Sequence, residues 1–240
     1  MIELISRSTR ALRSAVAALI GCLAFAAPAH AVNIEVDITV DNSYALFYGT
    51  ETTATNFVGS DFSWGPAESY VFNLPSDHYI YVVTESDLNV AQGFLGQFTN
   101  LDTGYRFHSN SPQWQVTATG RRGLAPYTAA GIAELTGQLV VANAGTNPSG
   151  GWVGLTEGPS NGSSPWGTIS GIDSAAHWVW YSSNGDPDPT SPGFDHDEYL
   201  IFRIAVAATP APGSVPAPGP FLLLGAGLAA LGFSRVRRKR

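Results

Sequence analysis

Apolar and polar residues alternate along much of the chain with the period of two that is typical of β-strands. The clearest example covers residues 33–40, where isoleucine or valine occupies every second position and Glu35, Asp37 and Thr39 lie between them. This pattern predicts a strand with one buried face and one hydrated face. Between the two ends of the chain no apolar period of about 3.6 residues is sustained, which argues against a helical protein.

Further strands are expected where aromatic or β-branched residues are bounded by turn-forming residues. These segments are 44–48, 69–74, 79–84, 94–98, 113–119, 138–141, 177–181 and 199–207. One or two helical turns are expected at 129–135. Short strands joined by turn-rich connections predict an all-β fold, in which two antiparallel sheets pack as a sandwich.

The first 31 residues have the three parts of a secretory signal peptide. Arginines precede an apolar run at 15–27, and Ala29 and Ala31 form an A-x-A cleavage pattern, so the mature chain is expected to begin at Val32. Alternatively, residues 19–22 fit a lipobox that would make Cys22 the acylated first residue of a lipoprotein. Cleavage there would shorten the hydrophobic run and leave apolar residues on the mature protein, so we favour cleavage after Ala31.

The C-terminal 26 residues, 215–240, combine a Pro-rich motif, an apolar segment and a basic tail. A helix over the apolar segment 221–233 would reach roughly 20 Å, against a hydrocarbon core of roughly 30 Å. We therefore expect a transient membrane segment whose basic end stays in the cytoplasm. A Pro/Ala/Gly linker at 209–214 separates it from the body at 32–208. The basic tail consists of Arg235, Arg237, Arg238, Lys239 and Arg240.

This C-terminal segment resembles the PEP-CTERM sorting signal of bacterial surface proteins, in its Val-Pro-x-Pro variant. Val215, Pro216 and Pro218 carry the match, and Ala217 replaces the acidic residue of the commonest form. The resemblance implies processing by an exosortase, a membrane-embedded cysteine transpeptidase, while signal peptidase removes the N-terminal segment. The alternative is an ordinary C-terminal membrane anchor. Either interpretation places the body outside the inner membrane, in the cell envelope or the extracellular space.

The body of the protein is acidic and free of thiols. Residues 32–214 contain 18 acidic and four basic side chains, a formal net charge of −14, whereas the whole chain has −7. Such a surface repels phosphate backbones, so nucleic acid is not an expected partner. The expected partners are cations, neutral polymers or basic surfaces. Because Cys22 is the only cysteine, signal cleavage would leave neither disulfide nor cysteine nucleophile nor Cys-ligated zinc.

Several segments of the body resemble galactose-binding-domain-like jelly rolls. Residues 40–49 (VDNSYALFYG) look like the opening strand pair of that family, while 177–180 (HWVW) and 198–203 (EYLIFR) are similar to a tryptophan strand and a Phe-Arg strand. The resemblance implies a jelly-roll sandwich, a fold that commonly binds sugars. It assigns no sugar-binding residue in this chain, and it leaves 121–171 without a counterpart.

Tryptophans offer a separate indication of sugar binding, because the apolar faces of sugars stack on aromatic rings. Trp178 and Trp180 lie two residues apart on one predicted strand, so we expect them to share a buried face. Trp152 and Trp166 lie among Gly, Pro, Ser and Asn, and we expect them to be the exposed pair. They are the candidate glycan-binding residues, with packing inside a loop as the alternative.

A run of acids near the C-terminal end of the body is a candidate site for structural calcium, since Ca²⁺ prefers oxygen ligands from carboxylates and loop carbonyls. Its spacing differs from that of an EF-hand, and a hydrated loop without a metal is the alternative. No other cofactor is expected. The candidate ligands are Asp186, Asp188, Asp195 and Asp197.

No sequence motif indicates a catalytic site. The H-E-x-x-H and phosphate-binding glycine patterns are missing, and the acids are too numerous to single out a catalytic pair. We therefore expect a non-enzymatic, exported bacterial surface or matrix protein that associates with exopolysaccharide. The alternatives are a secreted hydrolase acting on polysaccharide and a purely structural matrix protein without a ligand.

Overall fold

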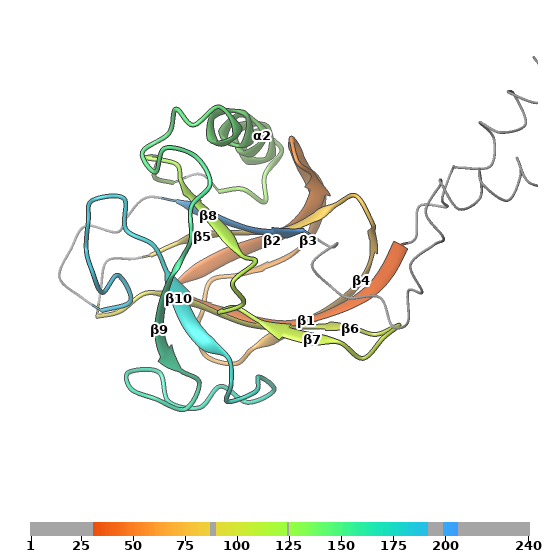
Figure 1. The fold of residues 1–240 in the computed structure, drawn as a ribbon, viewed down its shortest axis with the longest axis vertical. Coiled ribbons are helices and arrows are strands. Elements are labelled where there is room, and N and C mark those ends of the chain that lie inside the picture. Colours follow the sequence, from red (N-terminus) through yellow and green to blue (C-terminus); the bar gives the residue numbers. More distant parts are fainter. Residues whose placement is uncertain (1–30, 87–89, 124, 192–198, 206–240) are drawn as a thin grey trace, which may run out of the picture.

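The computed structural model describes residues 31–86, 90–123, 125–191 and 199–205. These residues form two antiparallel sheets and one helix (Figure 1), which confirms the predicted all-β sandwich. Within these ranges no helix is long and apolar enough to cross a bilayer. Ala29, the sorting motif of Val215, Pro216 and Pro218, and the basic tail at 235–240 lie outside the described residues.

The first sheet has the strand order β4-β1-β6-β10-β9, with β7 also paired to β6. All of its pairings are antiparallel. Its strands are β1 (Ala31–Asp41), β4 (Glu68–Pro75), β6 (Gly93–Asn100), β7 (Arg106–His108), β9 (Thr156–Ser160) and β10 (His177–Trp180).

The second sheet has the strand order β3-β2-β5-β11-β8, again antiparallel throughout. Its strands are β2 (Ser43–Thr50), β3 (Thr53–Asp61), β5 (Tyr79–Glu85), β8 (Gln115–Ala118) and β11 (Leu200–Ala205). Each predicted strand except 138–141 overlaps an observed one. The polar strands β3, β7 and β9 escaped prediction because they contain little alternating hydrophobicity and are formed by pairing with β2, β6 and β10.

The main core lies between the two sheets. The alternating apolar side chains of β1 from residue 34 to residue 40 are fully buried there, as their alternation predicts, and they pack with Leu46 of β2 and Phe202 of β11. Aromatic rings fill the centre, with the Phe94 ring centroid 5.4 Å from that of Trp114 and 5.3 Å from that of Phe202. Such interlocked rings fix how the two sheets face each other.

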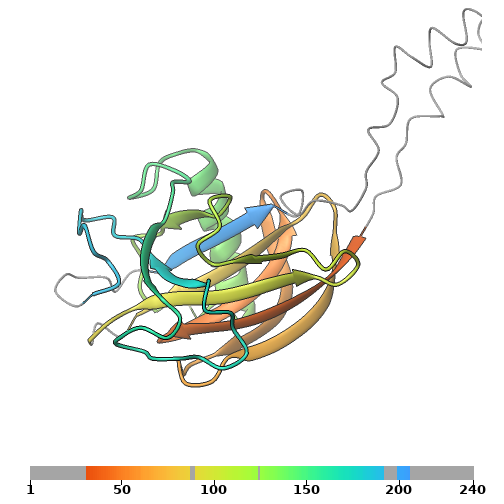
Figure 2. The ribbon, with the colours of Figure 1, turned by 60° about the horizontal axis from the view of Figure 1, so that its bottom comes forward.

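The helix α2 (Ala129–Asn143) covers the outer face of the second sheet, on the opposite side of the molecule from the segment between β9 and β10 (Figures 1 and 2). The prediction of a strand at 138–141 is therefore wrong. Leu135, Leu139 and Ala142 recur at helical spacing, and all three are buried. The side chain of Thr128 caps the helix by accepting a hydrogen bond from the backbone N–H of Gly131 at 3.0 Å.

The two tryptophans of β10 are both buried, as expected, but they do not share one hydrophobic cluster. Trp180 packs in the main core, whereas Trp178 packs with Leu95 and Trp166 on the outer side of the first sheet. The pairing register of β10 with β9 shifts between His177 and Val179. This irregularity interrupts the simple alternation on which the expectation of a shared face rested.

Candidate functional site

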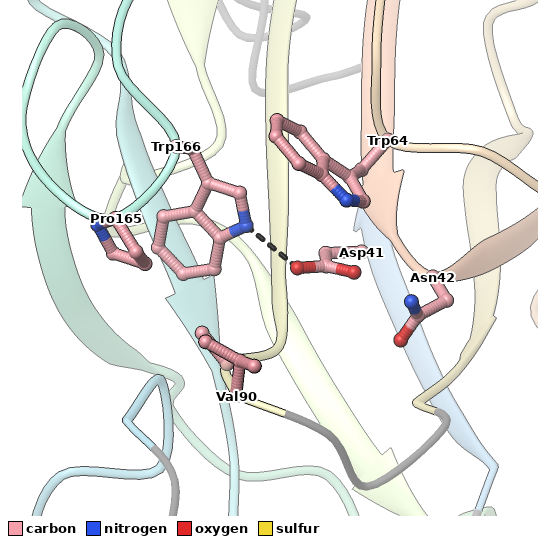
Figure 3. A pocket seen from close by; sticks show the side chains of 7 residues that line it. Asp41, Asn42, Trp64, Val90, Pro165 and Trp166 are labelled. Carbon is pink, nitrogen blue, oxygen red and sulfur yellow. Dashed lines mark hydrogen bonds between the residues drawn. The ribbon is translucent and has the colours of Figure 1, made fainter.

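A cavity of about 280 Å³ lies at one end of the first sheet (Figure 3). Its walls come from four places in the sequence: the end of β1, the β3–β4 loop, the residues just before β6, and the β9–β10 segment. The lining residues are Asp41, Asn42, Trp64, Val90, Ala91, Pro165 and Trp166.

The β9–β10 segment is organised by the buried side chain of Asn161. Its Nδ2 donates to the carbonyl oxygens of Ile169 and Ile172, at 3.0 and 2.7 Å, and its Oδ1 accepts from the backbone N–H of Ile169 at 2.8 Å. We call residues 161–176 the Asn161 loop. Three buried hydrogen bonds from one amide hold this loop in a single shape.

Trp166 projects from the Asn161 loop against the outer face of the first sheet. Its ring stacks on that of Trp178, with centroids 4.0 Å apart and planes 18° apart. Its Nε1 donates to Oδ2 of Asp41 at 2.7 Å (Figure 3). A hydrogen bond to a carboxylate in a buried position is strong and directional, so Trp166 fixes the orientation of Asp41 in the cavity wall.

Trp64 forms the exposed part of the site. Its side chain is 40% exposed, and its backbone carbonyl accepts a hydrogen bond from Oγ1 of Thr39 in β1 at 3.0 Å, which ties the β3–β4 loop to the sheet. Figure 3 shows the Trp64 ring above the Asp41 carboxylate and the Trp166 ring to its left. The carboxylate therefore lies beside two indoles of the cavity lining, one buried and one open to solvent.

This combination of groups suits a sugar. Indole rings offer surfaces for apolar C–H groups, while the carboxylate of Asp41 and the amide of Asn42 are groups that bind hydroxyls. The cavity is slightly smaller than the roughly 300–1,000 Å³ that is usual for small-molecule pockets, so it has room for about one sugar residue.

The structure corrects the expected exposed pair. Trp166 is only 6% exposed, because it packs on Trp178 in the cluster outside the first sheet. Trp152 is half-buried on the other layer of the sandwich, where its Nε1 donates to Oδ1 of Asn143 at 2.7 Å. The guanidinium carbon of Arg203 lies 3.7 Å from the centroid of the Trp152 ring. The two predicted glycan-binding residues are therefore not brought together, and one face of Trp152 is occupied by Arg203.

Sequence reasoning missed Trp64, Asp41 and Asn42 as members of one site. Trp64 is followed by Gly65 and Pro66, the same turn-rich setting that directed attention to the other two loop tryptophans. That signal could have added Trp64 to the candidates. Nothing local in the sequence could have placed it beside Asp41.

The structure describes only part of the acidic run. The backbone N–H of Asp188 donates to Oδ1 of Asp186 at 3.0 Å, and the hydroxyls of Thr190 and Ser191 donate to the Asp188 carboxylate at 3.1 and 2.7 Å. Asp195 and Asp197 lie outside the described residues. In the ranges that are described, no group of three or more His, Cys, Asp or Glu could hold a metal ion, so calcium binding stays a prediction.

Outside the cavity, a cluster of titratable side chains joins the two sheets near their edges. The hydroxyl of Tyr44 in β2 donates to Oε2 of Glu68 in β4 at 3.2 Å and lies 3.0 Å from the hydroxyl of Tyr70. Burial, together with the nearby charge of Asp61, raises the pKa of Glu68 above its usual range. Burial also raises the pKa of Tyr44, which stays protonated at neutral pH. The cluster acts as a polar link between the layers.

Scans of the chain against protein-family models, curated proteins and solved structures gave no match. A function for the cavity must therefore be derived from its own side chains. Among the described residues, these include one carboxylate, one amide and two indoles, and no basic side chain.

Proposed function

We propose that this chain is an exported, non-enzymatic bacterial surface or matrix protein that binds extracellular polysaccharide through the Trp64–Trp166 cavity. The supporting observation is the placement of Asp41 beside two indoles, in a cavity with room for about one sugar residue. One sugar residue of the polymer stacks on Trp64, and its hydroxyls bind Asp41 and Asn42. A jelly-roll relationship to galactose-binding-like domains is part of this proposal.

The proposal includes the route by which the protein reaches the polymer. Signal peptidase removes residues 1–31, the segment 221–233 enters the inner membrane, and an exosortase cleaves near Val215. The acidic body, with only four basic residues in 32–214, and the lone cysteine at position 22 are both compatible with an oxidising location outside the inner membrane.

Trp64 is expected to contribute most of the binding energy. Aromatic side chains at the centre of a binding site commonly cost about 2 kcal/mol or more when truncated, which corresponds to roughly 30-fold in Kd. The Thr39 hydrogen bond holds the backbone of Trp64 beside β1, so little backbone ordering is required when a sugar stacks on the ring.

The test is a glycan array followed by calorimetry, using protein recovered after expression of the full chain. Trp64→Ala should weaken binding of the best glycan by about 30-fold. Phe62→Ala is the matched control, because Phe62 is an aromatic residue of the same loop that is 62% exposed and packs on Tyr127 outside the cavity lining. The control should bind like the wild type. Unchanged binding by Trp64→Ala, or no bound glycan at all, would contradict the proposal.

Two further measurements separate the alternatives. Release of reducing ends from a bound polymer would favour the hydrolase, and folding without any glycan binding would favour the structural matrix protein. Mass spectrometry of the mature termini should find Val32 at the N-terminus and a C-terminus near Val215. An intact chain that keeps both terminal segments would contradict the export route.

A further inference from the structure

The charge of the cavity narrows the class of sugar that it takes. Asp41 is only 6% exposed, and the described lining contains no Lys, Arg or His. A carboxylate in such a place favours a cationic ligand over a neutral one, because removal from water strengthens its attraction for a positive charge. Uronic acids and phosphorylated or sulfated sugars are disfavoured, since their anions would meet Asp41 and a body of formal charge −14.

The exposed indole of Trp64 reinforces this preference. A cation within about 6 Å of an indole ring is attracted by the negative face of the π-system, and tryptophan is the best side chain for this interaction. Figure 3 shows the Trp64 ring above the Asp41 carboxylate, whereas Trp166 meets the same carboxylate with its Nε1–H edge. A positive group that reaches the carboxylate therefore comes close to the Trp64 ring as well.

The apolar part of the lining requires that the cation be attached to a larger body. Val90, Ala91 and Pro165 provide surface for C–H groups, which a hydrated metal ion or a free ammonium ion would not use. A sugar ring with an amino substituent has both parts: apolar C–H groups for the rings and the aliphatic wall, and an ammonium group for Asp41.

We propose that the polysaccharide bound by this cavity contains amino sugars with free, positively charged amino groups. This inference rests on the proposed function and adds the ligand class. Each bound residue places its ammonium group against the Asp41 carboxylate and stacks its ring on Trp64. N-acetylation removes the positive charge, so an N-acetylated residue keeps the stacking and loses the charge interaction.

The experiment compares matched pairs of glycans on one array. Each amino-sugar oligosaccharide is printed with free amines and in N-acetylated form, alongside neutral and uronic-acid glycans, and the protein from full-chain expression is applied at about pH 6, where amines and uronic carboxylates both carry their charges. The free-amine member of a pair should bind more tightly than the N-acetylated member, by roughly fivefold or more. That difference should shrink at high salt, because screening weakens the charge interaction.

Two isosteric variants localise the effect. Asp41→Asn keeps an oxygen that can accept the Trp166 hydrogen bond but removes the charge, so it should abolish the preference for free amines while N-acetylated glycans still bind. Glu35→Gln removes one charge from the same strand, outside the cavity lining, and should keep the preference. It controls for general attraction between a polycation and an acidic protein.

The outcomes distinguish the two proposals. Equal binding of both members of each pair, or a preference that survives in Asp41→Asn, overturns the amino-sugar inference while the polysaccharide function stands. Binding of neutral or uronic glycans alone would also overturn the amino-sugar inference and leave the polysaccharide function standing. If no glycan of any class binds, or if Trp64→Ala binds like the wild type, the proposed function fails and the inference fails with it.

Discussion

Replacing Asn161 with alanine should loosen the loop that carries Trp166 and destabilise the fold. The substitution removes three hydrogen bonds and leaves the N–H of Ile169 and the carbonyls of Ile169 and Ile172 without their side-chain partner. Each buried backbone group left in this way costs about 1 kcal/mol or more. The free energy of unfolding should therefore fall by about 3 kcal/mol, or Tm by about 6–12 °C for a body of this size.

Urea denaturation and hydrogen exchange measure the two effects. Urea titration of Asn161→Ala gives the change in unfolding free energy, and exchange shows whether amides in 161–176 open faster than those of β1 and β6. Asn73→Ala is the matched control, since the Asn73 side chain is exposed and its hydrogen bond to Asn33 is long, at 3.3 Å. The control should change stability by no more than about 0.5 kcal/mol.

Asn161→Ala also tests whether the Asn161 loop supports glycan binding in the cavity. Because Trp166 orients Asp41 from within the Asn161 loop, Asn161→Ala should also weaken glycan binding under conditions where the protein stays folded. A loss of less than about 1 kcal/mol, together with unchanged exchange in 161–176, would show that other contacts hold the loop and would contradict the role assigned to Asn161.

Two other predictions concern the layers of the sandwich. Arg203→Lys should lower the free energy of unfolding by about 2 kcal/mol in urea titration. Lysine keeps the charge but loses the planar stacking on Trp152 and the hydrogen bonds of the guanidinium. A change below about 0.5 kcal/mol would argue that the stacking contributes nothing. Glu68→Gln should gain stability relative to the wild type as pH rises from about 4 to 7. The raised pKa of Glu68 means that the folded state binds this proton more tightly than the unfolded chain, so ionisation costs stability in the wild type. A pH-independent difference between the two proteins would contradict this assignment.

The sequence by itself determined the strands whose side chains alternate. Residues 33–40 show why: a period of two sends every second side chain to one face of the sheet, and only a buried face requires a continuous apolar set. The same local rule failed at 138–141. Valine pairs favour strands, but the spacing of Leu135 and Leu139 places both on one helix face, and packing of that face on the second sheet outweighs the propensity of single residues.

The candidate site was decided by the tertiary structure. Trp152 and Trp166 have similar neighbours in the sequence, yet one packs under Arg203 outside the second sheet and the other on Trp178 outside the first. Asp41 and Trp166 are 125 positions apart and meet only because the Asn161 loop folds back across the first sheet. Local residue patterns specify which face a side chain takes, while contacts between distant segments depend on how the sheets pair and which loops cover them.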